Sequence, residues 1–259
     1  MSPQKNKVRS DSARAALHRQ RAAQAAAQRR SAMLVRVAWI TGAVLVAGMI
    51  GTIVWAIGTA RPGTPSATSA SAVVTPPNAT QDGALSFGNA DAPVTVAVYA
   101  DFMCPYCGQF ERANGDDLTK AVEAGTVKLE YHPMAFLDEM SSGTRYSTRA
   151  ANAFVTLAAA DPAVALRFGS LLYANQPAEN TSGLTDEQLA SFATQAGASA
   201  EAVGSMQAQT YVGWLQQSTQ QAFAAGVTGT PTVKINGTGW QEGLYVPGAL
   251  AGAITQAKG

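Results

Sequence analysis

Cys104 and Cys107 are the only cysteines in this sequence of 259 residues, and they lie in the stretch DFMCPYCGQF. A disulfide that closes so short a loop stabilises a fold by at most about 2 kcal/mol, because the stabilisation grows with loop length. A structural zinc site needs four ligands, and His132 is the only histidine in the C-terminal 200 residues. We therefore expect no zinc, whereas a two-thiolate Cu(I) site remains an alternative because soft thiolates suit that ion.

Thiol–disulfide exchange is the chemistry that best suits two cysteines separated by two residues. Proline is best tolerated at the first helical position, so a helix that begins at Pro105 places Cys104 at its N-cap. The free N–H groups there stabilise a thiolate. Cys107, one turn further, is expected to face the protein body and to resolve the mixed disulfide formed by Cys104. Pro105 and Tyr106, between the two cysteines, are candidates for tuning the potential.

The pair sits where a predicted strand turns into a predicted helix. The apolar run PVTVAVYA predicts a buried strand directly before it, and helical spacing follows from Gly108 to Ala124. A capping-box pattern at Thr185 to Gln188 lies within an Ala- and Gln-rich region of about 143–226, which predicts a helical subdomain. The remaining predicted elements are strands at 127–131, 231–236 and 243–246 and a helix at 247–258. This order predicts an α/β domain with a helical insertion.

The segments TVAVYADFMCPYC and GVTGTPTVKING resemble the DsbA-like branch of the thioredoxin superfamily, in its membrane-anchored Gram-positive, actinobacterial type. The resemblance covers about residues 85–258. It implies a thioredoxin-like fold with an inserted helical subdomain that roofs the groove beside the active site. It also implies that Pro231 follows a cis peptide bond and faces the redox pair, and that Thr230 offers backbone hydrogen bonds to a bound substrate segment.

The N-terminal third of the sequence has a different composition. Residues 1–36 carry nine Lys and Arg against one acid, and residues 37–60 form an uncharged apolar run long enough to span a bilayer. Since basic flanks stay cytoplasmic, we expect a single-pass anchor with the C-terminal domain outside the cytoplasm; a cleaved signal peptide is the alternative. Residues 61–83 are rich in Pro, Ser and Thr and predict a tether, which leaves 84–259 as the extracytoplasmic domain.

Four further residues near the pair have ordinary structural interpretations. Asp101 is expected to be a turn or helix-entry residue, with proton transfer as the alternative. His132 is expected to face solvent or to cap an element, rather than to serve redox or copper chemistry. Phe102 and Met103 either form a docking surface for unfolded substrates or pack against the subdomain.

These features predict an extracytoplasmic thiol–disulfide oxidoreductase that introduces disulfides into exported, cysteine-containing polypeptides through Cys104 and Cys107. We expect no metal, no organic cofactor and no nucleic-acid partner, and we expect a monomer. By resemblance, a membrane redox partner, quinone-linked, re-oxidises the pair. The alternatives are an isomerase or reductase kept reduced by a membrane electron donor, and a non-catalytic Cu(I)-binding or substrate-holding module.

Overall fold

The computed structural model describes residues 73–258. The basic segment 1–36, the predicted membrane span 37–60 and the first part of the predicted tether lie outside the described residues. Among the helices of the described part, none combines the length and apolar character that a bilayer crossing needs.

A five-stranded sheet forms the centre of the domain, in the order β1-β3-β2-β4-β5. β2 and β3 run parallel, whereas β1 pairs antiparallel with β3, and β4 pairs antiparallel with both β2 and β5. The strands predicted near 93–100, 127–131 and 231–236 are confirmed as β2, β3 and β4. The strands are β1 (Leu85–Phe87), β2 (Val94–Ala100), β3 (Val127–Pro133), β4 (Thr232–Ile235) and β5 (Thr238–Gly239).

The two faces of β2 contribute to different apolar clusters. Val96 and Val98 face the large core, which includes side chains of α2 (Pro105–Glu123) and α8 (Ala249–Ala257). Ala97 and Tyr99 belong to a smaller cluster covered by α7 (Val212–Ala224). Successive strand residues point to opposite faces, so an unbroken apolar run is what a strand covered on both faces requires.

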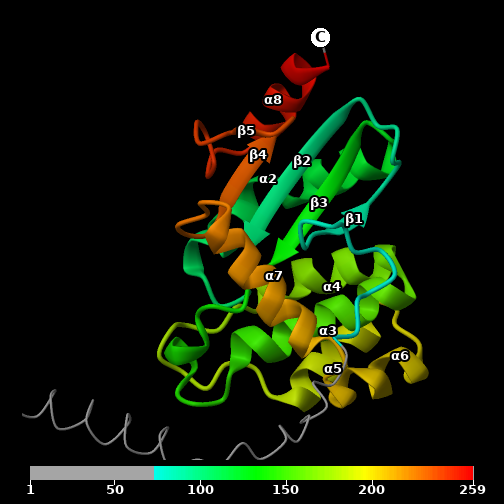
Figure 1. The fold of residues 1–259 in the computed structure, drawn as a ribbon, viewed down its shortest axis with the longest axis vertical. Helices are drawn as coiled ribbons and strands as arrows, with labels where there is room; N and C mark the ends of the chain where they lie inside the picture. The colour runs from blue at the N-terminus through cyan, green and yellow to red at the C-terminus, as the bar shows by residue number, and fades with distance from the viewer. Residues whose placement is uncertain (1–72, 259) are drawn as a thin grey trace, which may run out of the picture. The chain divides into compact units, whose positions relative to one another are not determined.

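The chain between β3 and β4 is helical and forms the insertion that the sequence predicted. Figure 1 shows its helices gathered beyond the C-terminal ends of β2 and β3, with α7 leading back toward β4. The predicted capping box is present, with reciprocal hydrogen bonds between Thr185 and Gln188. The helices are η1 (Asp138–Ser141), α3 (Tyr146–Ala160), α4 (Pro162–Ala174), α5 (Asp186–Gln195), α6 (Ala200–Ser205), η2 (Met206–Ala208) and α7. The predicted thioredoxin-like fold with a helical insertion is confirmed.

The last strand lies earlier than the sequence analysis placed it. The prediction of a strand at 243–246 is wrong, because these residues form a turn in which the Val246 N–H donates to the Gly243 carbonyl. Asn236 and Gly237 both have positive φ, at 48° and 79°, which makes a two-residue hairpin. Such a tight turn returns the chain at once, so β5 pairs with β4 from Thr238 onward.

The end of the predicted tether contacts the domain. The Ser86 N–H donates to the Asn78 carbonyl, and Ala79 forms an isolated bridge with Leu85. A Cβ added at Gly83 would come within 2.7 Å of the Ser218 side chain on α7. The domain described by the structure therefore includes residues before Ala84.

Candidate active site

The redox pair lies at the N-terminus of α2, directly after the central strand. α2 begins at Pro105, as the sequence predicted, and Cys104 is its N-cap with an extended backbone. The Cys104 carbonyl accepts hydrogen bonds from the N–H groups of Cys107 and Gly108, at 3.0 and 3.2 Å. Pro105 has no N–H, so the Tyr106 N–H is left without a helical acceptor, and it is one of the groups that lower the pKa of Cys104.

The two sulfurs have opposite electrostatic environments. Both cysteines are free thiols; 5% of Cys104 is exposed and 1% of Cys107. Hydrogen bonds lower the pKa of Cys104 to about 6, first from the Cys107 side chain, then from Thr230 and the N–H groups of Cys107 and Tyr106, and they outweigh burial. Burial, followed by the adjacent Cys104 sulfur, raises the pKa of Cys107 well above its ordinary value. At neutral pH the reduced pair is a Cys104 thiolate beside a Cys107 thiol.

A second segment, 126 positions away in the sequence, completes the site. The Cys104 Sγ lies 3.3 Å from the Thr230 carbonyl oxygen, to which it donates when it is protonated. The Thr230–Pro231 peptide bond is cis, which confirms the prediction made from the resemblance. The register of the sheet brings these residues together, because Thr232 of β4 lies opposite Tyr99 of β2.

The hydroxyl of Thr230 faces the sulfurs as well. It is buried and has no partner of ordinary hydrogen-bond geometry among the described residues. It nevertheless lies close enough to both sulfurs to lower the pKa of Cys104 and of Cys107. The Thr230 hydroxyl therefore lies beside the redox pair and has no other hydrogen-bond partner in the described residues.

An exposed aromatic rim borders the pair. Tyr106 is 58% exposed, and its ring centroid lies 6.2 Å from that of Tyr245. Tyr245 and the neighbouring Val246 are also exposed, whereas Phe102 and Met103 are fully buried in the core. The packing alternative for Phe102 and Met103 is therefore the correct one. Tyr245 was not among the predicted site residues, because no local pattern in the sequence relates this turn residue to the cysteines.

The Asp101 carboxylate connects three segments of the chain by hydrogen bonds beside the redox pair. Its carboxylate is fully buried and accepts hydrogen bonds from the Met103 N–H, the Ser147 hydroxyl and the N–H groups of Phe136 and Leu137, at 2.7 to 3.1 Å. Burial raises the pKa of Asp101 to about 6 in spite of these four donors. The bond to Met103 forms an Asx-type turn before the N-cap, in agreement with the expected turn role.

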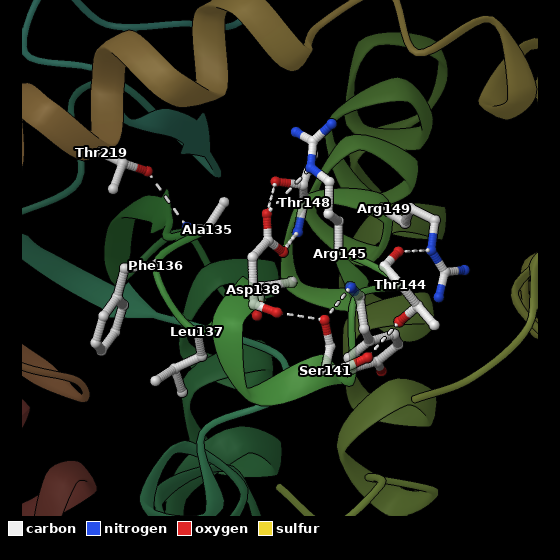
Figure 2. Close-up of polar contacts among 12 residues, drawn as sticks. Ala135, Phe136, Leu137, Asp138, Ser141, Thr144, Arg145, Thr148, Arg149 and Thr219 are labelled. Atoms are coloured by element: carbon white, nitrogen blue, oxygen red, sulfur yellow. Dashed lines mark hydrogen bonds and ion pairs between the residues drawn. The ribbon is translucent and has the colours of Figure 1, made fainter. Parts of the chain in front are cut away.

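The loop between β3 and α3 positions Ser147 for this contact. Arg145, the N-cap of α3, adopts the left-handed conformation and makes no side-chain cap bond. Figure 2 shows that Asp138 and Ser141 replace it: Asp138 accepts from the Thr148 N–H and hydroxyl, and the Ser141 hydroxyl oxygen accepts from the Tyr146 N–H. The N-terminus of α3 is therefore fixed by residues outside the helix.

His132 does not belong to this site. It is 2% exposed and stacks on Tyr99, with ring centroids 3.9 Å apart. Burial lowers the pKa of His132 to about 4, so the imidazole is neutral at physiological pH. The expectation of a solvent-facing or capping residue is wrong, because the C-terminal end of β3 is covered on this face as well. In residues 73–258 no group of three or more His, Cys, Asp or Glu side chains is arranged to hold a metal ion.

Comparisons with known proteins agree with this architecture. The family model described as Thioredoxin matches residues 80–245. The oxidised DsbA of Mycobacterium tuberculosis is 30% identical, with a TM-score of 0.59 over 68% of this chain and 93% of that one. The MdbA thiol–disulfide oxidoreductase of Corynebacterium matruchotii is 29% identical, with a TM-score of 0.55 over 64% of this chain and 87% of that one.

A curated relative is much longer than this chain. The serine/threonine-protein kinase PknE of Mycobacterium tuberculosis is 33% identical over 154 residues, which are 56% of this chain. The match covers 27% of the kinase, so this chain spans about a quarter of that relative. The family match, the fold and the geometry around Cys104 lead to one assignment: the chain belongs to the thioredoxin family and has the fold of its DsbA-like thiol–disulfide oxidoreductases.

Proposed function

We propose that this protein is a DsbA-like thiol–disulfide oxidase that transfers the Cys104–Cys107 disulfide to pairs of cysteines in exported polypeptides. The observation that carries the proposal is the asymmetry of the pair. Cys104 lies at the helix N-terminus with its pKa lowered to about 6 and its Sγ against the Thr230 carbonyl, while the pKa of the buried Cys107 is raised. This asymmetry gives each sulfur a separate role.

The proposed reaction has two exchange steps. A substrate thiolate attacks the Cys104 Sγ of the disulfide, the bond between the two protein sulfurs breaks, and its electron pair stays on Cys107. Cys107 then takes up a proton, because its pKa is high. A second substrate thiolate attacks the substrate sulfur of the mixed disulfide, and Cys104 leaves as a stable thiolate. Two substrate thiols are oxidised to a disulfide, and the protein is reduced to a dithiol.

The low pKa of Cys104 sets the direction of this reaction. A stabilised thiolate stabilises the reduced protein, and each pKa unit corresponds to about 30 mV for a two-electron couple. A fall from 9.0 to about 6 therefore shifts the potential toward the oxidising side by about 30 mV at pH 7, and by up to about 90 mV above pH 9. Leaving-group ability changes in the same direction, since the thiolate of lower pKa leaves faster.

An extended polypeptide segment suits the surface beside the pair. We propose that the backbone of Thr230 pairs with this segment and that the exposed rim of Tyr106, Tyr245 and Val246 contacts its apolar side chains. Aromatic side chains offer a large contact area at a low entropic cost. Such contacts depend little on sequence, as an oxidase with many substrates requires.

We further propose that the domain works outside the cytoplasm, held by a single helix at 37–60. The basic residues before this run support this placement, and disulfides form and persist outside the cytoplasm. After each cycle an electron acceptor must regenerate the disulfide. We propose a quinone-linked membrane protein for this step and a monomeric oxidase as its partner.

The reduction potential of the full chain in detergent tests the direction. The protein is equilibrated with glutathione, the redox state of Cys104 and Cys107 is read by thiol alkylation, and oxidation of a dithiol peptide is followed in parallel. We expect a potential near the DsbA end of the family range, roughly −120 mV, together with rapid peptide oxidation. A value near that of thioredoxin, roughly −270 mV, would favour the reductase or isomerase alternative. Tight Cu(I) binding with negligible peptide oxidation would favour the non-catalytic module.

A further inference from the structure

Gln176 connects the helical insertion to the segment 101–104 directly before α2, called here the redox loop. It follows α4 by two residues, and its side-chain Nε2 donates to the Phe102 carbonyl at 3.1 Å and to the Cys104 carbonyl at 2.8 Å. These two carbonyls flank Met103, directly before the first turn of α2. One amide therefore spans the peptide segment that leads into the redox pair.

Gly108 provides the space that this amide occupies. A Cβ at Gly108 would lie 2.2 Å from the Gln176 Oε1 and 3.0 Å from its Cδ, which is too close for a side chain in both places. Gly108 lies inside α2 with ordinary helical geometry, where a glycine costs about 1 kcal/mol relative to alanine. The close approach of Gln176 supplies a physical reason for a glycine directly after Cys107.

The redox loop is fixed from two sides by side chains of other segments. Asp101 accepts from the Met103 N–H on one side, and Gln176 donates to the Phe102 and Cys104 carbonyls on the other. The neighbouring Pro105 and Tyr106 are exposed, so the first turn of α2 has little other packing on its outer surface. The first N–H groups of a helix have no intrahelical acceptors, so contacts from other segments help to fix the chain that leads into the first turn.

We propose that Gln176 is a positioning residue for the redox reaction. By holding the carbonyls of Phe102 and Cys104, its amide keeps the N-terminal turn of α2 oriented so that helix N–H groups face the Cys104 sulfur, and Gly108 admits the amide to this position. The proposal rests on the proposed function, because it concerns how the same Cys104 is activated. It assigns to the helical insertion a direct influence on the redox equilibrium, in addition to covering the sheet.

The test compares variants of the full-length protein. Gln176→Met keeps the length of the side chain and removes the donor, and Gln176→Glu places an acceptor against the two carbonyls. Gly108→Ala displaces the amide without altering it. Asn175→Ala is the matched control, since among residues 73–258 the Asn175 amide donates to the Leu171 carbonyl of its own helix end and to no other acceptor. The readouts are the pH titration of thiolate absorbance at 240 nm, the equilibrium with glutathione, and thermal unfolding of the oxidised form.

We expect Gln176→Met to move the Cys104 titration to higher pH and to shift the glutathione equilibrium about threefold to tenfold toward a less oxidising protein, the range of one net hydrogen bond. Gln176→Glu shifts both further in the same direction. Gly108→Ala reproduces the effect of Gln176→Met, and the double variant adds little, because both changes remove one contact. Asn175→Ala behaves as wild type.

Two results would overturn the proposal. One is a Gln176→Met protein that unfolds at a lower temperature but has the wild-type titration and glutathione equilibrium, which would make the amide a structural contact only. The other is full additivity of Gly108→Ala and Gln176→Met. These comparisons are made relative to wild type, so they remain decisive even if the wild-type potential is thioredoxin-like and the oxidase function is thereby rejected.

Discussion

The helix that carries the cysteines and the first long helix of the insertion bury their side chains in different ways. α2 buries seven of its nineteen residues, in an amphipathic pattern that leaves its N-terminal edge at the surface. α3 buries twelve of its fifteen, including Ser147, Thr148, Asn152 and Thr156. A helix buried on nearly all sides needs partners for its polar groups, and for Ser147 at the N-terminal end that partner is Asp101, beside the redox pair.

Polar contacts between the insertion and the thioredoxin core cluster near the active site. The Ser147 hydroxyl donates to Asp101, the Ser170 hydroxyl donates to Glu111, and the Tyr131 and Tyr173 hydroxyls lie 3.1 Å apart. The Gln176 amide donates to the carbonyls before α2. Apolar packing holds the insertion on the sheet, and two of these contacts, those of Ser147 and Gln176, reach the segment 101–104. The helical insertion therefore covers the sheet by apolar packing and also holds active-site residues in place by hydrogen bonds.

The largest effect is expected from substitution of the two cysteines at the N-terminus of α2. Cys104→Ser should reduce peptide oxidation to the uncatalysed rate, because the attacked sulfur is gone. Cys107→Ser should retain Cys104 and accumulate a stable mixed disulfide with the peptide, since no second thiol resolves it. Oxidation of the dithiol peptide measures the first effect, and mass spectrometry of the intact protein after incubation with an activated peptide disulfide measures the second. Equal trapping by the two variants would contradict the separate roles assigned to the sulfurs.

The reduced protein should gain stability with rising pH. The folded pKa of Cys104 is about 6 against 9.0 for an ordinary thiol, so between these values the unfolded state binds more protons. Stability from this group is therefore present above pH 9, declines as the pH falls, and is lost below 6, with a span of up to about 4 kcal/mol. Urea unfolding of the reduced protein at several pH values, with Cys104→Ser as the reference, measures it. If the difference in unfolding free energy between the reduced wild type and Cys104→Ser stays constant from about pH 6 to about pH 9, Cys104 is not a thiolate in this range.

Removal of the Asp101 carboxylate should destabilise the junction between the two regions. Asp101→Ala leaves four buried donors without an acceptor, which should cost about 3 to 5 kcal/mol. Ser147→Ala removes one of these donors and keeps the carboxylate, so about 1 kcal/mol is expected. Chemical denaturation of the oxidised forms gives both values. Losses of similar size would mean that Asp101 is not the centre of this network.

The smallest expected change is at Thr230. Thr230→Val removes the hydroxyl beside the sulfurs at nearly constant volume, so the Cys104 thiolate should form at a pH up to about one unit higher. The unfolding temperature should stay the same or rise, because the hydroxyl is buried without a partner of ordinary geometry among the described residues. Thiolate absorbance and thermal unfolding separate the two effects. A lower unfolding temperature with an unchanged titration would assign the hydroxyl a structural role instead.

Local sequence signals predicted the part of the site that local chain geometry creates. Proline at position 105 after a buried strand fixed the start of α2 and the N-cap position of Cys104. The capping box at Thr185 was visible for the same reason, since its two partners are three residues apart. Resemblance supplied Pro231, whose cis bond no local rule indicates. By contrast, residues 243–246 have the composition of a strand. Composition does not reveal that β4 has already paired with β5 through the hairpin at Asn236 and Gly237.

Contacts between distant segments could not be read from the chain. Nothing near Gln176 or Ser147 distinguishes them from other polar residues of the insertion, and nothing near His132 shows that α7 packs on its face of the sheet or that Asp82 lies beside it. Sequence by itself determined the redox pair, the strand before it and the helix after it, because these depend on residue types a few positions apart. Only the tertiary structure decided which side chains hold that pair in place, because a hydrogen bond needs two groups within about 3 Å, and packing alone brings residues of different elements that close.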